Sequence, residues 1–180
     1  MSIGPDGRLR GVSFIASPNC DARPAGARVS LLVVHSISMP PGVYGGDGVE
    51  RLFTNRLDAH AHPYFRDKVH MRVSAHFFVR RDGAVQQYVP VQLRAWHAGV
   101  SRWRARERCN DCSVGIELEG LEGGRFMPAQ YRALAALTRA LRSSLPLRAC
   151  AGHSDVAPGR KRDPGARFEW PGLLARLLER

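Results

Sequence analysis

The sequence has very little lysine and no long hydrophobic run. Lys68 and Lys161 are the only lysines, so all but two of its 27 basic residues are arginine. The longest strongly apolar stretch, Leu31 to Val34, is far too short to span a bilayer. The first residues also lack an apolar run of signal-peptide length. These absences predict a soluble protein that binds no membrane and resides in the cytoplasm.

Cysteine is scarce as well. In a reducing cytoplasm the four cysteines are best interpreted as free thiols. Cys109 and Cys112 have the spacing of half a zinc ribbon, but there is no second pair to complete one. No HExxH motif is present either, which excludes thermolysin-type metalloprotease chemistry.

The charge is strongly positive, with a formal net charge of +11 and a pI near 10.7. Such a balance is found in proteins that bind nucleic acid, anionic lipid or small anionic substrates. The arginines are scattered, without a block of five or six and without the repeated aromatic and basic motif of an RNA-binding sheet. A solvated basic surface is therefore favoured, followed by attraction of anionic substrates, and nucleic-acid binding rests on the pI alone.

The chain length and the apolar pattern favour a single α/β domain. A chain of 180 residues with 44% hydrophobic content suits one domain with a real core. The continuous apolar run 30–35 predicts a strand buried on both faces that ends at His35, before a loop rich in glycine and proline. Strands followed and separated by helices predict a mixed central β-sheet flanked by α-helices.

Further elements follow from turn signals and periodicity. We expect strands at 12–15 (at an edge), 73–80, 84–89 and 113–118, with a hairpin turn at 81–83 and a loop over 90–112. We expect helices at 49–57, at 128–145 with Tyr131, Leu134, Thr138, Leu141 and Leu145 on one face, and from about Pro171 with Leu173, Leu174, Leu177 and Leu178 turned inward.

Two histidines and an aspartate form a candidate metal site. Catalytic zinc takes three protein ligands and keeps one position open for water. His35 ends the apolar strand, His153 follows a strand-like stretch, and Asp163 lies ten positions later in a loop bent by glycines and prolines. By spacing alone, this loop could equally be a solvated surface turn.

Other histidines have simpler interpretations. His60 and His62 could bind a metal as His-Ala-His, but they precede Pro63 in a polar segment and are better explained as a solvated loop. His76 lies within a predicted strand and is expected to be a hydrogen-bonded core histidine. His97 either lines a pocket or caps a turn.

Five stretches together carry a family resemblance. They are LLVVHSISMPPGVYGG, RVSAHFFVRRDG, AWHAGVSRW, RCNDCSVGIELEG and GHSDVAPGRKRDPG. In this order, over residues 12–170, they resemble the type 2 zinc N-acetylmuramoyl-L-alanine amidases. That group includes phage-type amidases, peptidoglycan recognition proteins and the cytoplasmic amidases that act on 1,6-anhydromuropeptides in peptidoglycan recycling. The resemblance implies one zinc amidase domain over 1–180, with a core of about 12–178.

The resemblance also implies roles for particular residues. His35, His153 and Asp163 would be the ligands of a Zn²⁺ ion. Glu117, in the IELEG strand, would activate water as a general base. Lys161 would stabilise the negative charge that develops on the carbonyl oxygen. Glu119 shares the strand face of Glu117, so a catalytic role and a solvent-facing role remain alternatives for it.

The implied substrate is a small anhydromuropeptide, cut between the lactyl group of 1,6-anhydro-N-acetylmuramic acid and L-alanine. Its peptide carboxylates suggest arginine contacts, for which Arg72 and Arg108 are the candidates. Trp96 could pack on the sugar ring. Ser36 is a further candidate contact, although the family has asparagine at this position. We expect a monomer with no nucleic-acid partner.

Two other functions use the same fold. A non-catalytic module that binds peptidoglycan fragments would be expected to have lost a ligand, yet all the implied positions are filled. An exported autolytic amidase would act on the intact wall, and the missing signal segment argues against it.

Overall fold

A six-stranded mixed sheet forms the centre of the molecule in this computed structural model, which describes residues 1–178. Its strands are β1 (Ser13–Phe14), β3 (Leu31–Ile37), β4 (Phe77–Val79), β5 (Val85–Gln87), β9 (Ser113–Glu119) and β10 (Ala149–Gly152). Their spatial order is β1-β5-β4-β9-β3-β10. Strands β4, β9, β3 and β10 run parallel, whereas β5 is antiparallel to β4.

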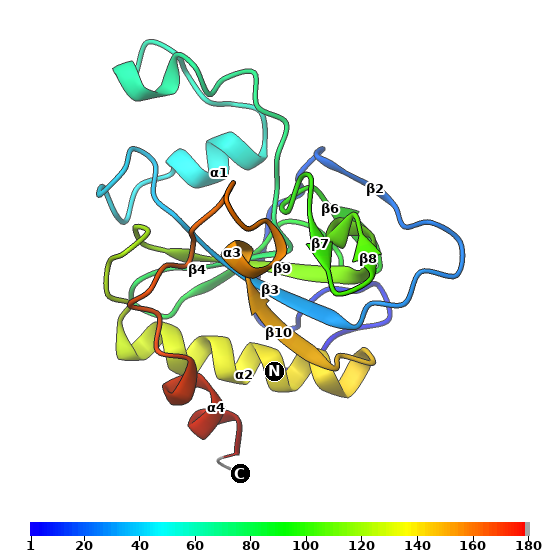
Figure 1. The fold of residues 1–180 in the computed structure, drawn as a ribbon. Coiled ribbons are helices and arrows are strands. Elements are labelled where there is room, and N and C mark those ends of the chain that lie inside the picture. Colours follow the sequence, from blue (N-terminus) through cyan, green and yellow to red (C-terminus); the bar gives the residue numbers. More distant parts are fainter. Residues whose placement is uncertain (179–180) are drawn as a thin grey trace.

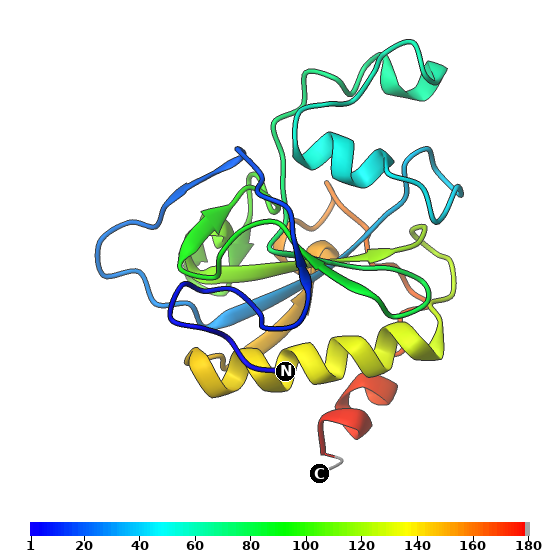
Figure 2. The same ribbon diagram turned by 180° about the vertical axis from the view of Figure 1, so that it is seen from behind.

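Helices cover both faces of this sheet. They are α1 (Gly48–Phe53), α2 (Pro128–Ser144), α3 (His153–Val156) and α4 (Trp170–Leu178), with 3₁₀ turns η1 (Pro63–Phe65) and η2 (Cys109–Cys112). Helix α2 runs along one face with α4 packed beneath it, and α1 lies on the other side (Figure 1). The view from behind shows the same layers (Figure 2). The predicted α/β class with a mixed central sheet is confirmed.

Alternation along the central strands separates the core from the functional face. Leu32 and Val34 of β3 join the cluster that packs on α2, which includes Leu134. Leu31 and Val33 belong to a separate cluster on the opposite face. Because successive side chains of a strand point to opposite faces, His35 falls on this second face. The residues of β3 therefore pack an apolar layer against α2 on one face, and the strand ends in the polar side chain of His35 on the other face.

The segment 90–112, predicted as a loop, contains regular structure. It holds β6 (Leu93–Ala95), β7 (Arg102–Trp103), β8 (Arg106–Glu107) and η2. Strand β6 pairs with β2 (Cys20–Ala22), and β7 pairs with β8. These strands are too short for a periodic pattern, and the partner of β6 is distant in sequence. The strand expected at 73–80 and the helix expected at 49–57 are also shorter than predicted.

In helix α4, one of the residues predicted to turn inward does not do so. Leu173 is buried and Leu177 packs against the main core, as expected. Leu174, however, is 58% exposed, because α4 packs against α2 along one face and leaves its other positions to solvent. The side chain of Leu178 lies outside the described part of the chain.

The cysteine and membrane expectations can be compared with the structure directly. All four cysteines are free, which confirms their interpretation as thiols. Among the helices of residues 1–178, none combines the length and the apolar character needed to cross a bilayer.

We expect Leu134→Ala to lower the free energy of unfolding by about 2–5 kcal/mol, because Leu134 is fully buried between α2 and the sheet. Leu174→Ala, at an exposed position of α4, should change it by less than about 0.5 kcal/mol. Urea unfolding of both variants checks this, and equal effects would contradict the described packing of α4.

Candidate metal centre

The candidate site lies where three neighbouring parallel strands end. His35 on β3 and Glu117 on β9 are direct register partners, and His153 follows the last residue of β10. In open sheets with parallel strands, ligands bind in the crevice beyond the carboxyl ends of the strands. Residues from three separate segments therefore meet on one edge of the sheet.

The loop after α3 returns Asp163 to the same point. The backbone N–H of Ser154 donates to the carbonyl oxygen of Asp163 at 2.9 Å. The N–H of Lys161 donates to the carbonyl of Ala157 at 3.0 Å, which closes the turn between them. The structure thus brings together all three residues of the predicted ligand set.

The three donor atoms lie close to the spacing of ligands around a tetrahedral metal ion. His35 Nδ1 lies 2.9 Å from His153 Nδ1 and 3.4 Å from Asp163 Oδ2, and His153 Nδ1 lies 3.1 Å from that oxygen. Ligands about 2.0–2.1 Å from a tetrahedral zinc ion stand about 3.3 Å apart. Within the described residues, this trio is the one group of histidine, cysteine and acid residues arranged in this way.

The ring nitrogens that face away from the cluster have their own partners. His153 Nε2 lies 3.2 Å from the carbonyl oxygen of Ala98, which can only accept a hydrogen bond. Nε2 therefore carries the proton, and Nδ1 presents a lone pair toward the cluster. His35 Nε2 lies 2.9 Å from Nδ1 of His97. Such outward hydrogen bonds are typical of metal-binding histidines.

The protonation states also suit a divalent cation. Burial is the main cause that lowers the pKa of His35 to about 4, so its imidazole is neutral near pH 7. Burial alone would raise the pKa of Asp163, but its contacts with the imidazoles of His153 and His35 hold this pKa below its usual range. A neutral His35 imidazole and an ionised Asp163 carboxylate are in the forms that bind zinc.

Glu117 lies beside the trio without a hydrogen-bond partner for one of its oxygens. Its Oε1 is 3.9 Å from His35 Nδ1, and its side chain is only 12% exposed. Oε2 is buried with no partner among the described residues. Burial, helped by the charge of Asp163, raises the pKa of Glu117 well above its usual value, and Lys161 opposes this shift. Such a carboxyl group is available to exchange a proton.

Glu119 is buried and hydrogen-bonded to the backbone, so the solvent-facing alternative for this residue is wrong. Its Oε1 accepts from the backbone N–H of Gly45 at 2.6 Å, and its Oε2 accepts from that of Arg81 at 3.0 Å. It is buried, with 4% exposure. It therefore ties two loops to the end of β9 and has no oxygen left for chemistry.

Two adjoining hollows open over the cluster. One, of about 340 Å³, is lined by His97, Glu117, His153, Asp163, Lys161, Ser36, Ser74, Tyr64, Lys68 and an apolar wall of Ile37, Met39, Leu52, Phe53, Met71 and Val73. The other, of about 510 Å³, shares Ser36, Ile37, Tyr64, Lys161 and Asp163 and adds Ser38, Pro41, Gly120, Leu121, Glu122, Arg160 and Arg162. Lys161 borders both, so its ammonium group can approach anything bound there.

The predicted substrate contacts are distributed unequally. Ser36 lines both hollows, and its buried hydroxyl has no partner among the described residues. The Trp96 indole instead donates to Asp21 at 3.2 Å. Arg72 donates to nearby backbone carbonyls, and Arg108 pairs with Asp111 at 3.3 Å. The last three do not line either hollow, and their substrate roles stay predictions.

The remaining histidines agree with their simple interpretations. His60 and His62 are exposed. His76 is fully buried: its Nδ1 accepts from the backbone N–H of Gly115 at 3.0 Å, and its Nε2 lies 3.1 Å from the carbonyl oxygen of Leu93. His97 lines the smaller hollow, one of the two positions considered for it.

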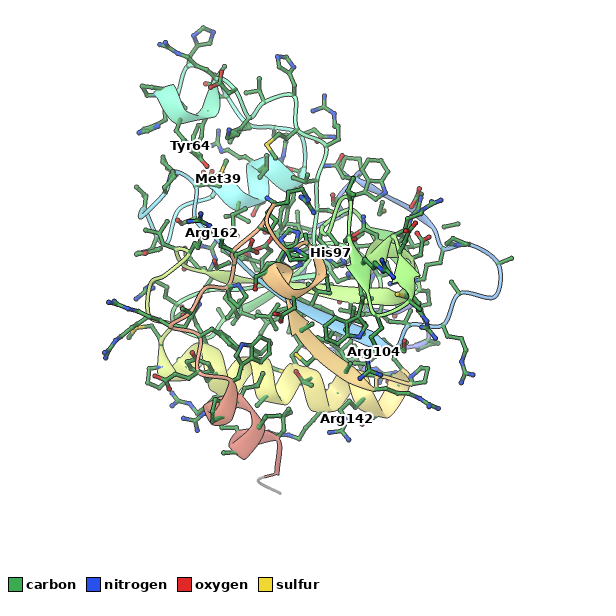
Figure 3. The ribbon with its side chains drawn as sticks, viewed as in Figure 1. Met39, Tyr64, His97, Arg104, Arg142 and Arg162 are labelled. Atoms are coloured by element: carbon green, nitrogen blue, oxygen red, sulfur yellow. The ribbon has the colours of Figure 1, made fainter. Side chains whose placement is uncertain are left out.

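Sequence reasoning missed several residues that face the site. Tyr64, Lys68 and Arg162 line the hollows. Nothing in the local pattern distinguishes Tyr64 and Lys68 from surface residues, whereas Arg162 lies within the GHSDVAPGRKRDPG stretch, between Lys161 and Asp163. Figure 3 shows Tyr64, Met39 and Arg162 on the side of the sheet away from α2, which carries Arg142.

Comparison with known proteins assigns the class. The model of the N-acetylmuramoyl-L-alanine amidase family matches residues 25–166. The chain therefore belongs to this family of amidohydrolases. It is 54% identical to the 1,6-anhydro-N-acetylmuramyl-L-alanine amidase AmpD of Salmonella typhimurium (strain SL1344), over 89% of this chain and 87% of that protein.

Solved structures of amidases have the same fold as this chain. A crystal structure of a selenomethionine AmpD derivative superposes with a TM-score of 0.95 at 49% identity, covering 98% of this chain and 99% of that one. The amidase AmiD from E. coli, in complex with the substrate anhydro-N-acetylmuramic acid-L-Ala-D-γ-Glu-L-Lys, superposes with a TM-score of 0.59 at 29% identity. It covers 86% of this chain and 60% of that one.

We expect Glu117→Gln to stabilise the zinc-free protein at pH 8, by about 1–3 kcal/mol, because it removes a buried charge that lacks a partner. A raised folded-state pKa means that the acid favours folding below its unfolded pKa, and this contribution is lost as pH rises through the folded pKa. The advantage of the variant should therefore shrink as pH falls toward 4. Urea unfolding in the presence of a chelator measures it.

The matched control is Glu119→Gln. Both oxygens of Glu119 accept backbone hydrogen bonds, so the amide would set one N–H group against another. We expect this variant to be less stable by about 1–3 kcal/mol. The same sign of change for both variants would contradict the distinction between the two glutamates.

Proposed function

We propose that this protein is a zinc-dependent amidase. It hydrolyses the amide bond between the lactyl group of 1,6-anhydro-N-acetylmuramic acid and L-alanine in anhydromuropeptides, in the cytoplasmic recycling of peptidoglycan. The observation that carries the proposal is the convergence of His35, His153 and Asp163 beside the unpartnered Glu117, next to a hollow that His153, Asp163 and Glu117 line. One domain spanning the chain, with a core of about 12–178, performs this reaction as a monomer.

The substrate class is supported by the similar proteins. The Salmonella relative is named for its action on 1,6-anhydro-N-acetylmuramyl-L-alanine, and the E. coli AmiD structure contains an anhydromuramic tripeptide. The hollows of this chain suit such a ligand, since an apolar wall adjoins a cationic mouth formed by Lys161 and Arg162. Bidentate pairing of an arginine with a peptide carboxylate adds both affinity and orientation.

Each side chain has a physical task in amide hydrolysis. A zinc ion held by His35, His153 and Asp163 would supply Lewis-acid chemistry, which polarises a carbonyl group and makes water a better nucleophile at neutral pH. Glu117 accepts the proton of the attacking water and delivers it to the leaving amine nitrogen. Lys161 provides a positive charge near the carbonyl oxygen as that oxygen becomes negative.

A non-catalytic binding module is the second candidate. Such a protein has no need for a buried, unpartnered carboxylate next to its ligand site, because the group costs stability and binds nothing. The presence of Glu117 in this state favours catalysis.

We expect Glu117→Ala to retain zinc and the fold but to lose turnover by about 10²–10⁴-fold, since general acid–base catalysis contributes on this order. His153→Ala should lose both zinc and turnover. Metal analysis measures the zinc content, circular dichroism checks the fold, and release of peptide from anhydromuramoyl tripeptide measures the turnover. Parental turnover by Glu117→Ala would remove Glu117 from the mechanism, and an active zinc-free protein would refute the metal centre.

Comparing the cleavage of intact sacculi with that of soluble anhydromuropeptide tests the proposed substrate class. Much faster cleavage of soluble anhydromuropeptide than of sacculi is expected, and the reverse would favour an autolytic amidase.

Arg162→Ala should raise KM by about 10-fold or more with little change in kcat, because loss of an ion pair with a substrate carboxylate removes binding common to ground and transition states. Arg142→Ala is the charge-matched control, since Arg142 lies on α2 across the sheet from the site. The same assay on Arg72→Ala, Arg108→Ala, Trp96→Ala and Ser36→Ala tests the substrate contacts proposed from sequence. An unchanged KM for Arg162→Ala would exclude Arg162 as a contact.

A further inference from the structure

We propose that His97 is a positioning residue that fixes the tautomer and ring orientation of His35. It does so through a hydrogen-bond relay that starts at the backbone carbonyl of Cys109. The inference rests on the proposed function, because it treats His35 as a metal ligand. It concerns residues outside the ligand trio and gives a role to the AWHAG and CNDCSVG motifs.

The relay begins at Ser113, which is fully buried at the start of β9. Its Oγ lies 2.6 Å from the carbonyl oxygen of Cys109 and 3.2 Å from Nε2 of His97. A carbonyl oxygen can only accept, and a hydroxyl has one proton to donate. Ser113 therefore donates to Cys109 and must accept from His97, which places the proton of a neutral His97 on Nε2.

The next step transfers this constraint to the metal site. With its proton on Nε2, His97 presents a lone pair at Nδ1, 2.9 Å from Nε2 of His35. His35 must then carry its proton on Nε2 and leave Nδ1 unprotonated. That Nδ1 is the atom 2.9 Å from His153 Nδ1 and 3.4 Å from Asp163. The backbone of Cys109 thus determines, through two side chains, which nitrogen of His35 can bind a metal.

The surroundings hold His97 in position. The amide oxygen of Asn110 accepts from the backbone N–H groups of His97, at 3.2 Å, and Ala98, at 2.8 Å. The ring lies directly over Gly115 of β9, where an added Cβ would come within 2.5 Å of His97 Cγ. His97 and His35 meet edge to face, with centroids 5.0 Å apart. The glycine of the β9 motif therefore provides the space that this ring occupies.

Three substitutions separate the relay from simple packing. His97→Phe keeps a ring but offers no acceptor to His35. His97→Asn places an amide oxygen near the former Nδ1 and keeps the acceptor. Ser113→Ala leaves both histidines but removes the group that orients the proton of His97. The control is Ser17→Ala, because Ser17 is also buried and bonded to a backbone carbonyl, that of Phe53, away from the histidines.

The first measurement is zinc affinity by competition with a coloured chelator. We expect His97→Phe to weaken zinc binding by about 10–100-fold, the usual effect of losing a group that orients a ligand. His97→Asn and Ser17→Ala should stay within about 3-fold of the parent, so recovery by asparagine identifies the acceptor as the required feature. Equal affinities for His97→Phe, Ser17→Ala and the parent would overturn the proposal.

The second measurement reads the tautomer directly, by ¹⁵N chemical shifts of His35 in the zinc-free protein. The parent should show the Nε2–H form, and Ser113→Ala should show a mixture of both tautomers. An unchanged Nε2–H form in Ser113→Ala would refute the relay. A parent that binds no zinc would refute the proposed metal centre, whereas the zinc-free spectra still decide whether the relay exists.

Discussion

The register between β3 and β9 is the constraint on which the functional face depends. It sets His35 directly opposite Glu117, and the neighbouring β10 ends one residue before His153. Because side chains alternate along a strand, a slip of one residue would turn these groups into the core against α2 and bring aliphatic residues to the site. The tightly packed apolar residues of β3 and β9 thus do more than stabilise the fold, since their burial specifies which polar groups meet.

The site shows how stability and function are divided between similar residues. Glu117 and Glu119 lie two positions apart on one face of β9, yet one has a buried oxygen without a partner and the other accepts two backbone hydrogen bonds. An unpartnered buried carboxylate costs stability, and proteins retain such groups where chemistry requires them. The well-bonded glutamate holds the loops around the site, and the poorly bonded one is the group that the proposed mechanism uses.

The polar interior extends beyond the proposed metal ligands. Behind His35 lie His97, Ser113 and the turn at Cys109, and behind His153 lies the carbonyl of Ala98. Each of these contacts ends on a backbone carbonyl, which cannot change its role as an acceptor. The two CxxC cysteines belong to this support: Cys109 supplies the carbonyl at the end of the relay, and both thiols are free and buried.

Local sequence determined the elements with long and regular patterns. The apolar run of β3, the alternating pattern of β9 and the proline-bounded amphipathic helix α2 were each predictable, because their burial repeats with a fixed period. The loop that carries His153 and Asp163 was recognisable from its glycines and prolines, and the family motifs singled out the candidate ligands. Tertiary structure decided the pairing of β2 with β6, the outward turn of Leu174 and the burial state of each glutamate. It also placed His97 against His35, a contact across 62 residues, and Arg162 at the cavity mouth. Periodicity records which face of an element is buried, but it carries no information on which distant side chain will complete a hydrogen bond there.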